Sequence, residues 1–84
     1  MILMERQEIL NLMNEIQEKR GRKKVENEEV LLSEIGFRSL DFSELALRVE
    51  RSFGGELPFD AVALREIRTA KSVLDFLEEA VKSA

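Results

Sequence analysis

Ser39 is the residue whose type and position best suit chemistry in this chain. It lies in the run IGFRSLD, residues 35–41, at the predicted start of a helix. The sequence contains no His, Cys, Tyr or Trp, which excludes a Ser–His catalytic pair, a thiolate nucleophile and a Cys/His metal site. If the protein handles reactive groups, an attachment must supply the reactivity, and Ser39 is the best attachment point.

The size of the chain limits what it can build. We expect one domain over residues 1–84, too small for a buried multi-residue active site. With 44% hydrophobic and 36% charged residues, the composition is that of a soluble globular protein. The absence of Cys fits a reducing compartment, and no apolar run approaches the roughly 20 residues that span a bilayer. The N-terminus lacks the pattern of a secretory signal, so we expect a cytoplasmic protein without a membrane span.

The charge of the chain bears on its partners. The formal net charge of −4 argues against bulk attraction to nucleic acid or anionic lipid. Residues 19–24, KRGRKK, are the local exception. The favoured interpretation is a helix C-terminus followed by a solvated loop, because cations suit the negative end of the helix dipole. The alternative is a docking patch for an acidic partner.

Hydrophobic spacing predicts the two helices of the first part of the chain. In the first, four apolar residues recur at i, i+3, i+4 and i+7 and Gly21 marks the end; they are Ile9, Leu12, Met13 and Ile16. The second runs from Ser39 to Phe53, before Gly54 and Gly55. Its core stripe consists of Phe42, Leu45, Ala46, Val49 and Phe53. The connection between the two helices is too apolar for a free linker, so we expect it to lie pinned across the bundle.

Two further helices follow the turn at Pro58. Asp60 is the expected N-cap of a short third helix that carries Leu64 and Ile67. Thr69 is the expected cap of a fourth, whose inward residues are Ala70, Val73, Leu74, Leu77 and Val81. The predicted fold class is therefore all-α, a small four-helix bundle with a long first loop and a short third helix.

The outer face of the second helix carries unexpected apolar residues. At about 100° per residue, Leu40 and Leu47 fall nearly opposite Leu45, and they share their face with Ser43. Single exposed apolar residues are ordinary on protein surfaces. Because both leucines lie beside the candidate attachment point, we favour a face that something else covers.

Two interpretations of Ser39 are open at this point. Serine is a favoured N-cap, and most serines at helix starts do only that. A phosphate ester in the first turn of a helix, however, would meet unpaired amide groups and the positive end of the helix dipole. The position suits a cap or a permanently anionic attachment.

The ordered set of these motifs resembles the acyl carrier protein family. The similarity runs from Leu32 to Leu77 and includes the Ser-Leu-Asp of residues 39–41, the Glu-Leu of residues 44–45, the Phe-Gly-Gly turn of residues 53–55 and the Leu-Pro of residues 57–58. The run IRTA, residues 67–70, leading into VLDFL, residues 73–77, resembles the family's last turn and helix. The expected four-helix arrangement matches the family fold.

The resemblance implies a function and a cofactor. Ser39 would carry a 4'-phosphopantetheine arm, transferred from coenzyme A by a phosphopantetheinyl transferase, and the thiol of the arm would hold acyl groups as thioesters. Acyl-loading and acyl-processing enzymes of fatty-acid, polyketide or related lipid metabolism would be the partners. The carrier itself catalyses nothing, so the chain is not expected to be an enzyme.

The resemblance also implies a partner surface on the second helix. Leu40 and Leu47 match positions where partners pack, and Asp41 and Glu44 would form the polar rim. Ser43 lies on the same face. Arg38, just before the serine, completes the candidate surface.

Three departures distinguish the chain from the fatty-acid carriers of the family. Arg38 stands where those carriers usually have Asp, and Arg48 and Arg51 offset the acidic residues of the second helix. Phe42 is large for the inner face and could fill space that an acyl chain would occupy. These differences indicate a specialised, free-standing carrier with its own partners. We expect Arg38 to pair with the phosphodiester of the arm or with an acidic partner.

Other functions are less favoured. The main alternative is an unmodified helical interaction module that uses Leu40 and Leu47 as anchors. A helix-turn-helix DNA binder would need basic and amide residues on one face, which the second and fourth helices lack. An independent enzyme would have only carboxylates, lysines, arginines and hydroxyls as catalytic groups. We expect a monomer, and the acyl group and the pathway stay open.

Overall fold

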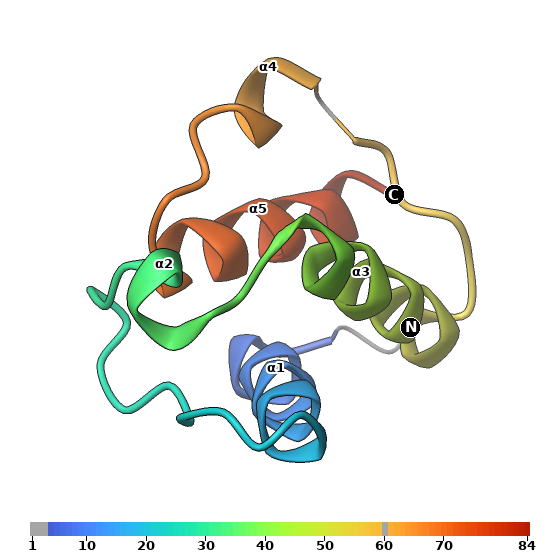
Figure 1. The fold of residues 1–84 in the computed structure, drawn as a ribbon. Coiled ribbons are helices and arrows are strands. Elements are labelled where there is room, and N and C mark those ends of the chain that lie inside the picture. Colours follow the sequence, from blue (N-terminus) through green and yellow to red (C-terminus); the bar gives the residue numbers. More distant parts are fainter. Residues whose placement is uncertain (1–3, 60) are drawn as a thin grey trace.

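Five helices make up the regular structure of the residues described by this computed structural model, 4–59 and 61–84. In chain order they are α1 (Arg6–Lys19), α2 (Leu32–Ile35), α3 (Ser39–Phe53), α4 (Ala61–Leu64) and α5 (Ala70–Ser83), as Figure 1 shows. Within those residues, β structure is limited to one isolated antiparallel bridge between Leu31 and Thr69. The predicted all-α class is confirmed, with one short additional helix, α2, inside the long first connection.

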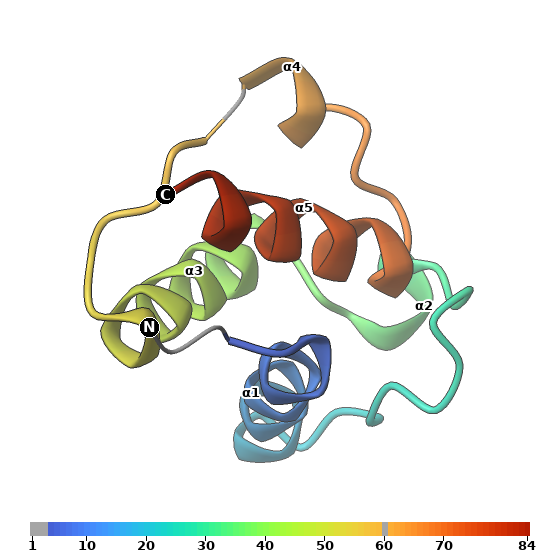
Figure 2. The same ribbon diagram turned by 180° about the vertical axis from the view of Figure 1, so that it is seen from behind.

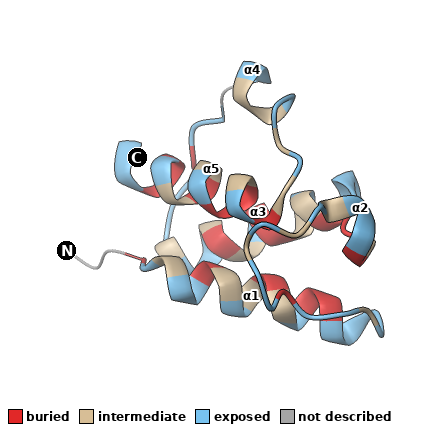
Figure 3. Cartoon of the chain, turned by 90° about the vertical axis from the view of Figure 1, so that its left-hand side faces the viewer, coloured by how far each residue is buried: buried red, intermediate tan, exposed pale blue. Residues whose placement is uncertain are grey.

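The three long helices α1, α3 and α5 enclose the core. Their apolar stripes face one another, as the buried bands in Figure 3 show. The predicted core positions are confirmed: Ile9, Met13, Ile16, Leu45, Ala46, Val49, Ala70, Val73, Leu74, Leu77 and Val81 are buried. Leu12, Phe42 and Phe53 pack against this core but stay partly exposed. Figure 2 shows the same three helices from behind, with α5 across α1 and α3. None of the helices in residues 4–59 and 61–84 is long and apolar enough to cross a membrane.

The connection between α1 and α3 is pinned to the bundle, as expected. The backbone N–H of Leu32 donates to the Arg68 carbonyl at 2.9 Å, and that of Ala70 donates to the Val30 carbonyl at 3.1 Å. The buried side chain of Gln17 donates to the carbonyls of Lys23 and Ile35, both at 2.8 Å. These contacts tie the connection to α1 and to the start of α5, so the approach to α3 has a defined path.

The start of α5 is capped as predicted. The Thr69 hydroxyl accepts a hydrogen bond from the Ser72 backbone N–H at 3.1 Å, and the Ser72 hydroxyl accepts one from the Thr69 N–H at 2.9 Å. This reciprocal pair satisfies two backbone donors at the helix start.

The short third helix of the prediction corresponds to α4. It lies apart from the three long helices in both ribbon views (Figures 1 and 2). The expectation that it carries Ile67 is wrong, because α4 ends at Leu64 and Ile67 follows after a turn at residues 65–66. None of the four residues of α4 is buried, and helices in proteins draw most of their stability from packing of a buried face. Packing therefore does not extend α4 as far as Ile67. Asp60, its predicted N-cap, lies outside the described residues.

Candidate functional site

Ser39 is the first helical residue of α3, and its side chain is not the cap of that helix. Arg38 is the N-cap, with φ −116° and ψ 179°, and its backbone N–H donates to Asp41 Oδ2 at 2.8 Å. Ser39 is exposed, and its hydroxyl makes no hydrogen bond to any described residue. The cap interpretation of Ser39 is therefore wrong. Asp41, at the third position of α3, accepts the capping hydrogen bond from the Arg38 backbone instead.

Gly36 sets the direction in which the chain enters α3. It ends α2 with a positive φ of 70°, a conformation that side chains with a Cβ disfavour. A Cβ on Gly36 would lie 3.3 Å from Cδ of Arg22, so the side chain of Arg22 crosses over the glycine. The next residue, Phe37, is buried in the core. Gly36 and Phe37 together hold the start of α3 against the bundle.

Asp41 is buried between α1 and α3. It is 2% exposed, and its carboxylate contacts Arg20 Nε at 2.9 Å and Arg22 Nη1 at 2.6 Å. Burial acts to raise its pKa, but the hydrogen bond from the Arg38 backbone and the guanidinium of Arg22 outweigh it and hold the pKa below its usual value. The expectation that Asp41 belongs to an exposed polar rim is wrong, because the carboxylate faces inward.

Glu44 is held by three cations one turn further along α3. Its carboxylate contacts Lys19 Nζ at 3.1 Å, Arg20 Nη2 at 2.6 Å and Arg48 Nη2 at 2.9 Å. The hydrogen bonds from Arg20 and Lys19 lower the pKa of Glu44 to about 2. Glu44 is partly exposed, so it reaches the surface only as a neutralised carboxylate.

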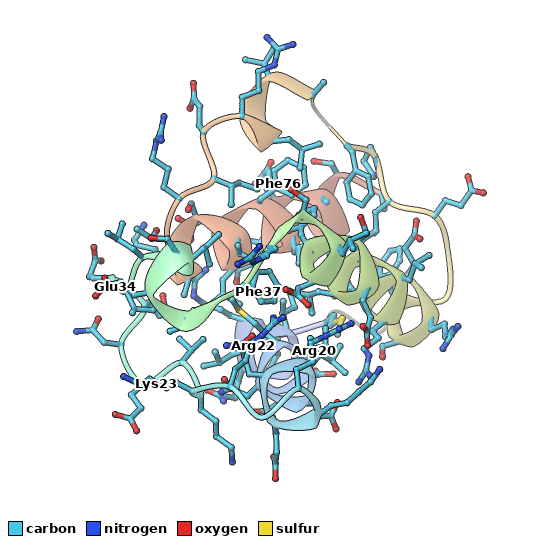
Figure 4. The ribbon with its side chains drawn as sticks, viewed as in Figure 1. Arg20, Arg22, Lys23, Glu34, Phe37 and Phe76 are labelled. Carbon is cyan, nitrogen blue, oxygen red and sulfur yellow. The ribbon has the colours of Figure 1, made fainter. Side chains whose placement is uncertain are left out.

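The contacts of Asp41 and Glu44 revise the interpretation of the basic run. The predicted helix C-terminus is confirmed, because Lys19 lies in the last turn of α1 and Arg20 is its C-cap. The solvated part of the interpretation is wrong for Arg20 and Arg22, whose guanidinium groups bind the Asp41 carboxylate of α3. Figure 4 shows Arg20 and Arg22 between α1 and α3. We call this group the charge cluster; it consists of Lys19, Arg20, Arg22, Asp41, Glu44 and Arg48.

The outer face of α3 is apolar and open. Leu40 is 82% exposed and Leu47, two turns further on, is 57% exposed, with Ser43 exposed between them. Arg38 is also exposed and forms no ion pair with a described residue. The predicted partner residues thus divide into two groups. Arg38, Leu40, Ser43 and Leu47 lie on the surface, whereas the two carboxylates are tied to α1.

A groove of about 1040 Å³ opens beside Ser39. On the α3 side it is lined by Arg38, Ser39, Phe42, Ser43, Ala46, Leu47 and Glu50. The opposite side contains residues that the sequence analysis did not assign to a site, namely Leu31, Leu32, Ser33, Phe37, Phe59, Leu64, Ile67 and Arg68. Their apolar spacing marked several of them for burial, but only the fold brings them to Ser39.

Phe42 forms one wall of this groove. Its ring lies 5.7 Å from the Phe76 ring in an edge-on arrangement and 6.4 Å from the Phe59 ring, measured between ring centroids. The Phe59 and Phe76 rings are also 5.7 Å apart. Phe42 and Phe59 of this aromatic group line the groove, and a cavity stays open beside them. The described residues hold no group of His, Cys, Asp or Glu that could bind a metal ion.

Comparison with known proteins identifies the family of the chain. No family model matches the chain, and no solved structure matches it. Among curated proteins, an acyl carrier protein of Coprothermobacter proteolyticus is 41% identical over 59 residues, which cover 64% of this chain and 70% of that protein. Identity at this level over most of the relative's length, together with the helical bundle described above, leads to one conclusion. The chain belongs to the acyl carrier protein family.

Proposed function

We propose that this protein holds acyl groups as thioesters on a 4'-phosphopantetheine arm attached to Ser39, and presents them to partner enzymes. The observation that carries the proposal is the state of Ser39. It stands in the Ser-Leu-Asp motif, exposed, as the first residue of α3, with a hydroxyl that no described residue engages. When bound, the arm supplies the thiol that a chain without Cys lacks.

The residues around Ser39 fit a phosphodiester. The first turn of a helix leaves backbone N–H groups without intrahelical acceptors, and the dipole of the 15-residue α3 favours an anion at that end. The exposed guanidinium of Arg38 adds a cation one residue away. The backbone N–H groups and the dipole would hold the phosphate and direct the arm along the groove, which leaves the Arg38 guanidinium free to meet a partner.

The groove gives the carried group a place to lie. Ser39 is part of its lining, and most of the remaining lining is apolar, including Phe42, Leu64 and Ile67. An acyl chain in this groove would lie along α3 and be shielded from water there. We therefore propose that the groove shelters the carried acyl group between encounters with partners.

The proposal includes the setting of the protein. We propose one carrier domain over residues 1–84 that is not an enzyme, works as a monomer in the cytoplasm and binds no nucleic acid. Its partners are a phosphopantetheinyl transferase and enzymes that load and process acyl groups. Fatty-acid, polyketide and other lipid pathways all supply such cargo.

The test is the mass of the protein after modification. The full chain is incubated with coenzyme A and a broad-specificity phosphopantetheinyl transferase, and its intact mass is measured. We expect one phosphopantetheine group per chain, none on Ser39→Ala, and one on Ser43→Ala, the matched control on the same face of α3. A parent chain that gains no group, or a Ser39→Ala variant that still gains one, would overturn the proposal.

The second candidate is an unmodified interaction module. The 82% exposure of Leu40 and the 57% exposure of Leu47 favour it, because a helical protein without a prosthetic group could use the two leucines as anchors. It predicts no mass change with coenzyme A and transferase, so the same experiment separates the two functions.

A further inference from the structure

The acidic residues of the first turns of α3 are not free to meet a partner. Asp41 is 2% exposed and bound by Arg20 and Arg22. Glu44 is bound by Lys19, Arg20 and Arg48. A carboxylate already neutralised by two or three cations offers little attraction to a further cation.

The ion pairs along α3 contain one more cation than carboxylates. In the contacts around α3, four cations meet three carboxylates: Lys19, Arg20, Arg22 and Arg48 against Glu15, Asp41 and Glu44. Arg38 adds a fifth cation, which has no ion-pair partner among the described residues. This local excess lies on a chain whose formal net charge is −4.

The apolar centre of the same surface is Leu40, beside Arg38 and Ser39. At 82% it is the most exposed large apolar side chain of the described residues, and Leu47 continues the apolar strip along α3. An exposed apolar strip with a charged rim is the pattern of a protein-docking surface, in which the rim selects the partner by its charge.

We propose that this surface docks partner enzymes whose contact face has an apolar pocket with carboxylates at its rim. The inference rests on the proposed function, because the first such partner is the phosphopantetheinyl transferase that must reach Ser39. Leu40 would enter the apolar pocket, and Arg38 would meet a carboxylate of the rim. The charge cluster would keep Asp41 and Glu44 from repelling that carboxylate.

Binding in the absence of coenzyme A tests the charge of the docking face. The full chain with Ser39→Ala, which cannot be modified, is titrated against the transferase of the organism that encodes it, and Kd is measured by calorimetry. Arg38→Glu is added to this background. Arg38→Lys, which keeps the charge, is the conservative variant.

Arg51→Glu in the same background is the matched control. Arg51 is an exposed arginine on the same helix, thirteen residues or about 20 Å from Arg38 along its axis, and it forms no ion pair with a described residue. Circular dichroism checks that all variants keep the helical content of the parent.

The expected result is an increase in Kd of about three- to tenfold for Arg38→Glu, with Arg38→Lys and Arg51→Glu within about twofold of the parent. A decrease in Kd for Arg38→Glu would mean a cationic partner face and would overturn the inference. An unchanged Kd for Arg38→Glu, or an equal increase for Arg51→Glu, would also overturn it. Modification of the parent chain at Ser39 is scored separately, so loss of the docking inference leaves the carrier function standing.

Discussion

Asp41 should be the most costly carboxylate of α3 to remove, because it is buried. The side chain combines two roles, because it caps α3 through the Arg38 backbone N–H at 2.8 Å and binds two guanidinium groups at 2.9 and 2.6 Å. Loss of an N-terminal capping interaction costs about 1 kcal/mol. Removal of one partner from a buried ion pair costs about 3–5 kcal/mol.

The cost of removing one partner from a buried ion pair must be reduced for this site. The side chains of Arg20 and Arg22 are 37% and 27% exposed, so both guanidinium groups can return to water when the carboxylate is absent. We take about 1–2 kcal/mol for the ionic part, which gives about 2–3 kcal/mol for Asp41→Ala. Asp41→Asn keeps an oxygen that can accept from the Arg38 N–H, so it should cost only the ionic part, about 1–2 kcal/mol.

Urea denaturation followed by the helical circular dichroism signal measures these costs, since the chain contains no Trp. Asp75→Asn is the matched control. Asp75 also meets two cations at 2.8 Å, from Arg6 and Lys71, but its side chain is 49% exposed, so its loss should cost less than about 1 kcal/mol. Equal costs for Asp41→Asn and Asp75→Asn would refute the reasoning from burial. Equal costs for Asp41→Ala and Asp41→Asn would refute the capping part.

Three further predictions follow from the same structure. Because Arg20 and Lys19 lower the pKa of Glu44 to about 2, its contribution to stability is complete above about pH 5 and is lost progressively as the pH falls from there to about 2. Glu44→Gln should therefore flatten the acid branch of stability against pH, and an unchanged slope would contradict this. Gly36→Ala should lower the free energy of unfolding by about 1–2 kcal/mol, because φ at residue 36 is 70° and the new Cβ would lie 3.3 Å from the Arg22 side chain. An unchanged free energy of unfolding in urea would contradict this. Phe42→Ala should cost about 2 kcal/mol and slow the hydrolysis of a long acyl thioester on the modified chain, because it deepens the groove; faster hydrolysis would argue against shelter in the groove.

The helices and the core could be predicted from the sequence because local signals specify them. Apolar spacing, Gly21 and the two glycines after Phe53 mark the ends and the inward faces of α1 and α3. The Thr69 cap depends only on a residue three positions away. The end of α4 could not be predicted from the sequence, because a four-residue helix has too little periodicity to show where it stops.

The site was predicted in part for the same reason. Ser39, Leu40 and Leu47 follow from local motif and helix period, and the structure places all three on the surface. The inward position of Asp41 does not follow from helix period alone. It requires the end of α1 to bring two arginines, about twenty residues earlier in the chain, against the first turn of α3.

Membership of the acyl carrier protein family therefore does not determine the charge of the proposed docking face. The motif around Ser39 contains the acidic residues Asp41 and Glu44, and counted along the sequence they make the start of α3 acidic. In the folded chain Lys19, Arg20 and Arg22 neutralise both carboxylates, whereas Arg38 stays unpaired within the described residues. Coulomb attraction depends on distances in the fold and not on order in the sequence. Two carriers with the same Ser-Leu-Asp motif can thus present opposite charge to their partners, and exchange of partners between them should fail even where the proposed attachment serine is the same.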